Sequence, residues 1–145
     1  MAEPSVEQLN DNVRGFDRLY GLRIVSYVEG DVSAEVTARD EVKQPAGLVH
    51  GGLYASIAES LASLATAIAV IPDGKMAMGL SNSTSFLRPI TDGVVHAHAA
   101  VIHRGRTTWV WDVQFTDDAG RSCAVTRMTI AVRPVPEGQA PLTLS

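Results

Sequence analysis

The sequence predicts a single α+β domain in which an antiparallel sheet wraps around one long central helix. Its 145 residues suffice for one domain with a substantial core. An apolar run from Leu53 to Ile71 contains one charged residue, Glu59, and has the length and composition of a buried helix. Strand-like stretches follow this run, and a long helix followed by an antiparallel meander is typical of the α+β class.

The chain before the central helix changes from helical to strand-like spacing. Residues 5–20 have apolar side chains at helical spacing and are expected to form a short helix. Within residues 22–41 apolar and polar side chains alternate, which predicts strand structure with a turn near Gly30. A loop at residues 44–47 then leads into the central helix.

The central helix is expected to run from about Gly51 to Val70, before a turn at residues 72–74. Its apolar stripe consists of Leu53, Ile57, Leu61, Leu64 and Ile68. Its opposite face consists of Ala55, Ser56, Glu59, Ala62, Ser63 and Thr66. A face in contact with solvent would normally show lysine, arginine or several glutamates. We therefore expect the sheet to cover one face and a second subunit to cover the other.

After the helix we predict four strands, near residues 75–88, 94–104, 107–117 and 121–133. One face of the third strand carries Trp109, Trp111, Val113 and Phe115. The connection at residues 117–120 is typical of a hairpin. We thus divide the chain into an N-terminal segment, the domain itself and a disordered tail rich in proline and glycine, at residues 1–20, 21–134 and 135–145.

Composition excludes several classes of function. The formal net charge of −4 argues against a nucleic-acid-binding groove. The single cysteine, Cys123, cannot form an internal disulfide, which fits a reducing compartment, and we expect a cytoplasmic protein and a small buried thiol. The first twelve residues have no apolar core and do not resemble a signal peptide. Glu59 in the middle of the apolar run favours a buried helix over a membrane span.

The start of the helix is the first candidate for chemistry. Backbone N–H groups at a helix N-terminus are unpaired, and Gly51 and Gly52 would let a ligand oxygen approach them closely. Such a group can polarise a carbonyl. The alternative is a tight strand-to-helix turn that simply requires glycine.

Glu59 is the second candidate, because a carboxylate alone on an uncharged helix must find donors or change its pKa if it is buried. It lies ~12 Å from Gly51 along the same helix axis, too far to act on one carbonyl. A facing helix from a two-fold-related subunit would bring the two together. Ser63, four residues on, could hold the carboxylate or a water. The alternatives are a structural ion pair between Glu59 and an arginine, and a small interface residue at Ser63.

The histidines are weaker candidates. His50 is most simply a turn or cap residue, with a role as general base as a second choice. His96 and His98 are expected to share one strand face and His103 the other, and no Asp, Glu or Cys is placed to complete a metal site. We therefore expect no metal.

Several motifs resemble one known family. Residues 47–52, Gly-Leu-Val-His-Gly-Gly, with Ala58-Glu59-Ser60 and Ser63, resemble the H-G-G…A-E pattern of hotdog-fold acyl-CoA thioesterases that use a glutamate. Further segments are similar to the Arthrobacter-type 4-hydroxybenzoyl-CoA thioesterases of the PaaI-like superfamily, namely residues 81–89, 107–113, 117–121 and 130–134. The resemblance covers roughly residues 20 to 134 and implies a hotdog fold.

The resemblance also implies roles for individual residues. Glu59 would be the nucleophile or general base, and the Gly51 N–H of the opposing subunit would polarise the thioester carbonyl. Gln44 would support that carbonyl or the helix end, His50 would position the substrate, and Ser63 would orient water or the leaving thiolate.

For binding, the resemblance implies that the nucleotide end of coenzyme A contacts Arg88, Arg106 and Thr107. The implied substrate is an aromatic acyl-CoA such as 4-hydroxybenzoyl-CoA, and the implied assembly is a homotetramer built as a dimer of dimers. No bound cofactor is implied. The main alternative is a non-hydrolytic module that binds acyl-CoA or an acyl carrier protein, and a dehydratase on the same fold is a third reading.

Overall fold

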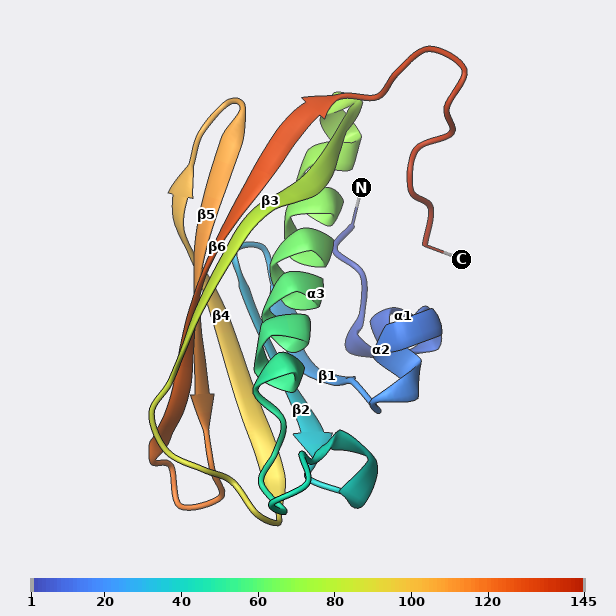
Figure 1. The fold of residues 1–145 in the computed structure, drawn as a ribbon. Coiled ribbons are helices and arrows are strands. Elements are labelled where there is room, and N and C mark those ends of the chain that lie inside the picture. The colour runs from blue at the N-terminus through green and yellow to red at the C-terminus, as the bar shows by residue number, and fades with distance from the viewer. Residues whose placement is uncertain (1, 145) are drawn as a thin grey trace.

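The computed structural model describes residues 2–144 as one antiparallel sheet with a long helix packed against it (Figure 1). The six strands lie in the order β1-β2-β4-β5-β6-β3. Their bounds are β1 (Arg23–Val28), β2 (Asp31–Thr37), β3 (Lys75–Phe86), β4 (Val94–Arg104), β5 (Thr108–Thr116) and β6 (Ser122–Pro134). The helices are α1 (Val6–Asp11), α2 (Gly15–Leu19) and α3 (Gly51–Val70), with short 3₁₀ turns at Asp40–Val42 and Ile71–Asp73. This architecture confirms the predicted α+β class and hotdog fold.

Helix α3 begins and ends where the sequence predicts, after His50 and before the turn at residues 72–74. His50 is the N-cap, and its Nδ1 accepts a hydrogen bond of 2.8 Å from the Gly52 N–H. At the other end the chain passes through Ile71–Asp73 into Gly74, whose φ of 68° is left-handed and favours glycine. The predicted bounds Gly51 to Val70 are those observed.

The face of α3 that packs on the sheet differs from the predicted stripe. Ala62 and Thr66, which we placed on the second face, are fully buried, whereas Leu64 and Ile68 are half-buried. Thr66 explains the rotation, because its Oγ1 accepts a 2.8 Å hydrogen bond from the indole N–H of Trp111 on β5. The same hydroxyl donates to the Ala62 carbonyl at 2.7 Å. A buried indole N–H needs an acceptor, and α3 supplies it.

The N-terminal segment forms two short helices and not the single helix expected. Gly15 has a φ of +56°, which a continuous right-handed helix does not allow. Helix α2 packs on α3 through Asp17, which accepts hydrogen bonds from the hydroxyls of Tyr20 at 2.8 Å and Ser60 at 2.5 Å. Part of the second face of α3 is therefore covered by this chain itself, which corrects in part the expectation that a second subunit covers it.

Strand β3 is an edge strand. It pairs only with β6, so its other edge presents N–H and C=O groups that no strand among residues 2–144 pairs. Its side chains are largely exposed, including those of Met78, Leu80 and Phe86. The β3 edge lies beside α3, on the side opposite to α1 and α2 (Figure 1).

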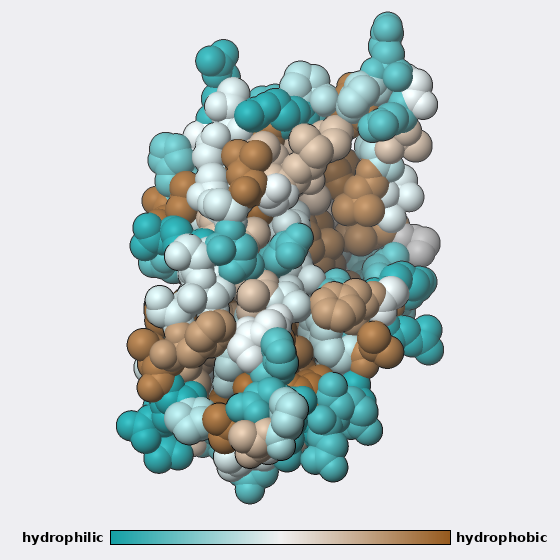
Figure 2. Space-filling model, viewed as in Figure 1, coloured by the Kyte–Doolittle hydropathy of each residue, from teal (hydrophilic) through white to brown (hydrophobic). Residues whose placement is uncertain are grey.

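The segment Gly51–Asp73 is long and apolar enough to cross a membrane by length and composition alone, with a mean hydropathy of 1.6. Here it is the central helix against which the sheet packs. Residues 135–144 form neither helix nor strand, and Leu144 packs against the core, so the disorder of this tail stays a prediction. Between the tail and the end of α3 lies an apolar hollow of about 500 Å³ (Figure 2).

Candidate active site

The Gly51 N–H at the start of α3 is an unused donor. The next two N–H groups of the helix are occupied, since that of Gly52 donates to the His50 ring and that of Leu53 donates to the His50 carbonyl at 2.9 Å. Within residues 2–144 the Gly51 N–H has no acceptor. The N-cap thus leaves one donor, at the positive end of the helix dipole, available to a ligand.

A cavity of about 400 Å³ opens beside Gly51. The ring of Phe86 lies so close that a Cβ at Gly51 would approach it to 2.7 Å, so glycine permits this packing. Gln44 lines the same cavity, and its Oε1 accepts a 2.5 Å hydrogen bond from the Ala46 N–H. Its carboxamide NH₂ makes no hydrogen bond within the described residues, so Gln44 has a donor to offer beside Gly51.

Tyr54 forms part of the wall of this cavity and was not singled out from the sequence. Its side chain is 3% exposed, packs edge-to-face on Phe115 at 5.2 Å, and has a hydroxyl without a hydrogen-bond partner in residues 2–144. Burial raises the pKa of Tyr54 to about 12. The Tyr54 hydroxyl therefore stays protonated and uncharged at neutral pH.

Glu59 lies in a second cavity of about 400 Å³, between α3 and α2. Its side chain is exposed and makes neither an ion pair nor a hydrogen bond with residues 2–144. The alternative of a structural pair with an arginine of the same chain is therefore wrong. Ser63 shares this cavity, as expected from its i+4 spacing.

Gly79 on β3 is a further residue of this site. A Cβ there would lie 3.9 Å from both the Glu59 Oε1 and the Ser63 Oγ, so the missing side chain leaves space beside the carboxylate. A glycine inside a predicted strand is a signal for close approach, and it could have identified this position.

The candidate residues of one chain thus lie in two separate cavities. Gly51, Gln44 and Arg88 line one cavity, whereas Glu59 and Ser63 line another. The structure therefore does not bring the carboxylate and the N–H donor together within one chain.

The residues expected to bind the nucleotide are also separated. Arg88 follows the end of β3, whereas Arg106 and Thr107 form the connection between β4 and β5. That connection lies near the start of β3, because Thr108 pairs with β6 at the residue that pairs with Met78. The Thr107 carbonyl is held there by the Val132 N–H at 2.9 Å. Within one chain the two groups lie at opposite ends of the sheet.

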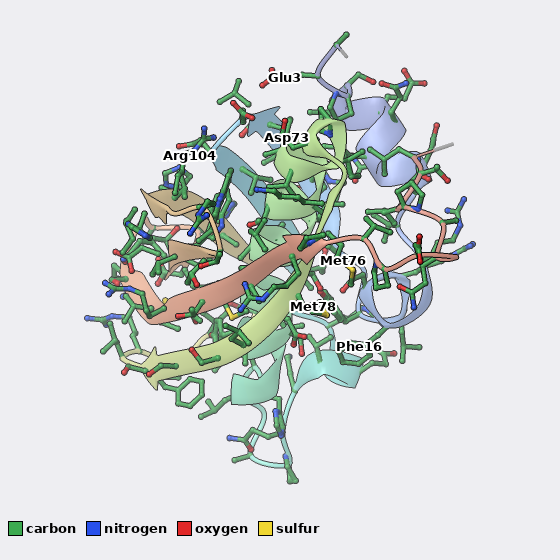
Figure 3. All side chains as sticks on the ribbon, turned by 90° about the horizontal axis from the view of Figure 1, so that it is seen from above. Glu3, Phe16, Asp73, Met76, Met78 and Arg104 are labelled. Atoms are coloured by element: carbon green, nitrogen blue, oxygen red, sulfur yellow. The ribbon has the colours of Figure 1, made fainter. Side chains whose placement is uncertain are left out.

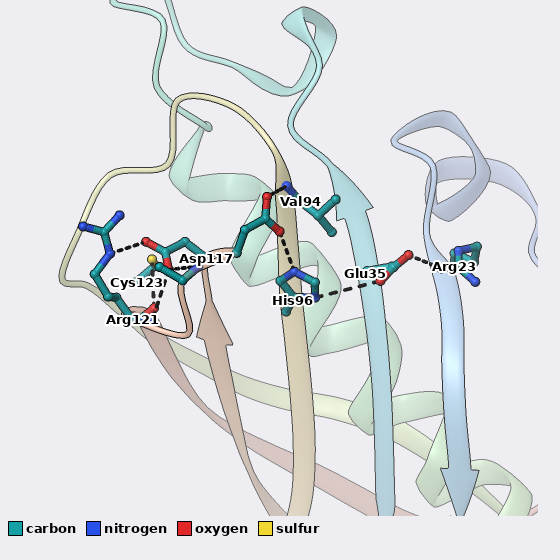
Figure 4. Close-up of polar contacts among 9 residues, drawn as sticks. Arg23, Glu35, Val94, His96, Asp117, Arg121 and Cys123 are labelled. Carbon is teal, nitrogen blue, oxygen red and sulfur yellow. Dashed lines mark hydrogen bonds and ion pairs between the residues drawn. The ribbon is translucent and has the colours of Figure 1, made fainter.

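The histidines on β4 do have carboxylate neighbours, contrary to the sequence analysis. His96 contacts Asp118 at 2.8 Å and Glu35 at 3.9 Å (Figure 4), and His98 contacts Asp31 at 2.8 Å. Long-range strand pairing creates these contacts, so the local sequence could not reveal them. No cluster of three or more His, Cys, Asp or Glu in the described residues is arranged to hold a metal ion.

Cys123 is a buried thiol, as expected. Its Sγ donates a 3.3 Å hydrogen bond to the carbonyl of Arg121, whose side chain pairs with Asp117 (Figure 4). Burial raises the pKa of the Cys123 thiol, which keeps it protonated. The Arg121 N–H and guanidinium hold the pKa of Asp117 below its usual value.

Known proteins are similar to this chain in sequence and in fold. Residues 46–124 match the family model described as the thioesterase superfamily. Thioesterase PA1618 of Pseudomonas aeruginosa is 35% identical over 133 residues, which cover 91% of this chain and 92% of that protein. The 1,4-dihydroxy-2-naphthoyl-CoA hydrolase of Listeria monocytogenes is 34% identical over 119 residues, 82% of this chain and 96% of that protein.

Solved structures agree. A crystal structure of a PA1618 variant with one glutamine replaced by alanine has a TM-score of 0.86, at 34% identity over 92% of this chain and 97% of that one. Two variants of SAV0944 from Staphylococcus aureus, each with one residue replaced by alanine, are 30% identical to this chain. The first has a TM-score of 0.80 and covers 83% of this chain and 100% of its own. The second has a TM-score of 0.78 and covers 81% of this chain and 98% of its own. Protein smu.793 of Streptococcus mutans, bound to acetyl-CoA, is 25% identical, with a TM-score of 0.73 over 85% of this chain and 94% of that one.

The SAV0944 variants replace one glutamate and one glutamine, and those two positions are separated by the same number of residues as Gln44 and Glu59 here. With the family model, the relatives and the fold in agreement, this chain belongs to the thioesterase superfamily and is a thioesterase with a hotdog fold.

Proposed function

We propose that this thioesterase hydrolyses an aromatic acyl-CoA, such as 4-hydroxybenzoyl-CoA, to the free acid and coenzyme A, as the Arthrobacter-type enzymes do. The observation that carries the proposal is a helix that begins with an unused N–H donor at Gly51 and presents an unpaired, exposed carboxylate at Glu59. The aromatic substrate named for the Listeria relative and the matching glutamine–glutamate spacing in SAV0944 support it.

In the proposed reaction the Gly51 N–H donates to the thioester carbonyl oxygen and stabilises the negative charge that develops there. The Glu59 carboxylate either attacks the carbonyl carbon, giving an anhydride that water then cleaves, or removes a proton from an attacking water. In both routes the C–S bond breaks and coenzyme A leaves as the thiolate, which then takes up a proton. No metal or redox cofactor takes part in either route.

Three side chains assist in this proposal. Gln44 donates its free NH₂ to the carbonyl oxygen or to the helix end. His50 uses Nδ1 as the helix cap, which leaves Nε2–H to position the substrate. Ser63 holds the water or the leaving thiolate beside Glu59.

The two groups of candidate residues combine into one site if two chains pair through their free β3 edges. Such a pair would place two α3 helices side by side in opposite directions, so that Glu59 of one chain approaches Gly51 of the other. The same reversal would bring the Arg106–Thr107 end of one chain toward Arg88 of the other, where both could bind the nucleotide of coenzyme A. We propose this dimer, and a tetramer of two such dimers, as the assembly of a cytoplasmic enzyme.

A thiol-release assay with a panel of acyl-CoAs tests the function. We expect kcat/KM of roughly 10⁴ M⁻¹s⁻¹ or more for aromatic acyl-CoAs, within the usual range for enzymes, and lower values for acetyl-CoA. Tight binding of acyl-CoA without thiol release would instead identify a non-hydrolytic module. Hydrolysis of an acyl carrier protein thioester, but not of the corresponding acyl-CoA, would show that the substrate is carried by an acyl carrier protein and not by coenzyme A.

Mixing two inactive variants tests the shared site. In a hybrid dimer of Glu59→Gln and Gly51→Pro chains, one active site carries both changes and the other carries neither. We therefore expect activity to return when the two variants are unfolded and refolded together, up to about a quarter of the wild-type value for random pairing with one intact site in each hybrid. If both groups acted within one chain, the mixture would stay inactive. Refolding each variant alone is the control.

A further inference from the structure

Helix α2 forms one wall of a groove along the outward face of α3. The cavity that contains Glu59 is neighboured by another of about 490 Å³ that contains His50 and Gly52. Phe16 and Ser56 line both cavities, so the two adjoin at these residues. The resulting acyl groove, as we call it, extends from His50 to Ser63 between the two helices.

Phe16 is an exposed ring on an anchored helix. It is 63% exposed, and it makes an edge-to-face contact with the ring of Tyr20 at 5.2 Å. Tyr20 and Ser60 both donate to Asp17, which fixes α2 on α3. Burial of Tyr20 raises its pKa, so its hydroxyl remains a donor. In the view from above, Phe16 lies at the edge of the molecule away from Arg104 (Figure 3).

We propose that Phe16 is a specificity-determining residue that contacts the acyl group of the substrate in this groove. The inference rests on the proposed function and assigns to α2 a role in choosing the acyl chain. Phe16 and Glu59 line the same cavity, so a substrate whose carbonyl lies at Glu59 would have its acyl group beside the Phe16 ring. A contact between two aromatic rings contributes binding free energy in addition to that of the buried apolar area.

The chemistry of the groove favours the acyl group over the nucleotide end of coenzyme A. Apolar side chains form part of the lining of its larger cavity, namely Phe16, Leu19, Val42 and Leu53. Arg39 pairs with Glu41 at 3.3 Å and Lys43 pairs with Asp40 at 3.5 Å. In the cavity that contains Glu59, the guanidinium of Arg14 donates to backbone carbonyls of its own segment. The proposed subunit contact uses the β3 edge, which lies on the other side of α3 from α2 and Phe16.

The test compares acyl groups on one carrier. For Phe16→Ala we expect kcat/KM for 4-hydroxybenzoyl-CoA to fall about tenfold or more relative to that for acetyl-CoA, as for the loss of a small apolar contact. Phe16→Leu should restore part of the preference. Arg18→Ala is the matched control, since Arg18 lies on the same helix outside both cavities, and the ratio should not change.

Three results would overturn the inference. An equal loss for both substrates would mean that Phe16 contacts the coenzyme A arm or only supports α2. An unchanged ratio in Phe16→Ala would mean that the ring does not touch the acyl group. A change of molar mass by light scattering, without a change in the ratio, would identify the groove as a subunit interface. Failure of the wild type to hydrolyse any acyl-CoA would instead contradict the proposed function, before any variant is compared.

Discussion

Glu59→Gln is expected to lower kcat for acyl-CoA hydrolysis by roughly 10³–10⁴-fold, because the amide can neither attack a thioester nor accept a proton from water. The thermal midpoint should hardly change. Glu59 is exposed and makes no ion pair with residues 2–144, and surface changes of this kind usually alter stability by within about 0.5 kcal/mol. Thiol release under saturating substrate and a thermal melt measure the two effects.

Asp17→Asn is the matched control, since Asp17 lines the same cavity as Glu59. Asp17 accepts hydrogen bonds from Tyr20 and Ser60, so its loss should lower the melting temperature and change kcat by less than about tenfold, far below the effect of a lost general base. A Glu59→Gln enzyme with most of its kcat would remove Glu59 from the mechanism and leave the fold assignment intact.

Gly51→Pro is expected to lower kcat by about 10²–10³-fold through loss of one hydrogen-bond donor to the carbonyl oxygen. Proline is suited to this position. Gly51 is the first residue of α3, where proline is favoured, and its N–H makes no bond that the fold requires. His50 already has the φ of −64° and ψ of 133° that a residue before proline adopts. Circular dichroism should therefore show an unchanged helix content.

The variant Gly51→Ala distinguishes the effect of losing the Gly51 N–H donor from the effect of disturbing the packing of Phe86. An alanine Cβ meets the Phe86 ring at 2.7 Å, as a proline would, but alanine keeps the N–H. Phe86 is largely exposed, so its ring can shift. We expect Gly51→Ala to stay within about tenfold of the wild-type kcat, well short of the loss of a carbonyl-polarising donor. An equal loss in both variants would assign the effect to Phe86 and argue against a role for the Gly51 N–H.

Most secondary structure could be predicted because it depends on local periodicity. The bounds of α3 match the prediction, those of β4 match as well, and the other strands after α3 differ from their predicted ranges by one or two residues at an end. The single N-terminal helix was wrong because Gly15 takes a left-handed φ that the apolar spacing does not reveal. The orientation of α3 was wrong in part because Thr66 turns toward the buried indole of Trp111, a contact between residues far apart in the chain.

The candidate site, too, could be predicted from the sequence only in part. The amino-acid sequence by itself identified Glu59 and the glycines at the start of α3, because a lone carboxylate and a bare helix end are unusual wherever the chain folds. Only the tertiary structure decided that Glu59 and Gly51 lie in separate cavities, that Gly79 leaves space beside the carboxylate, and that α2 covers part of α3. The physical reason is separation along the sequence. Helix and strand periodicity depend on residues a few positions apart, whereas a site is formed by contacts between residues that are far apart in the chain.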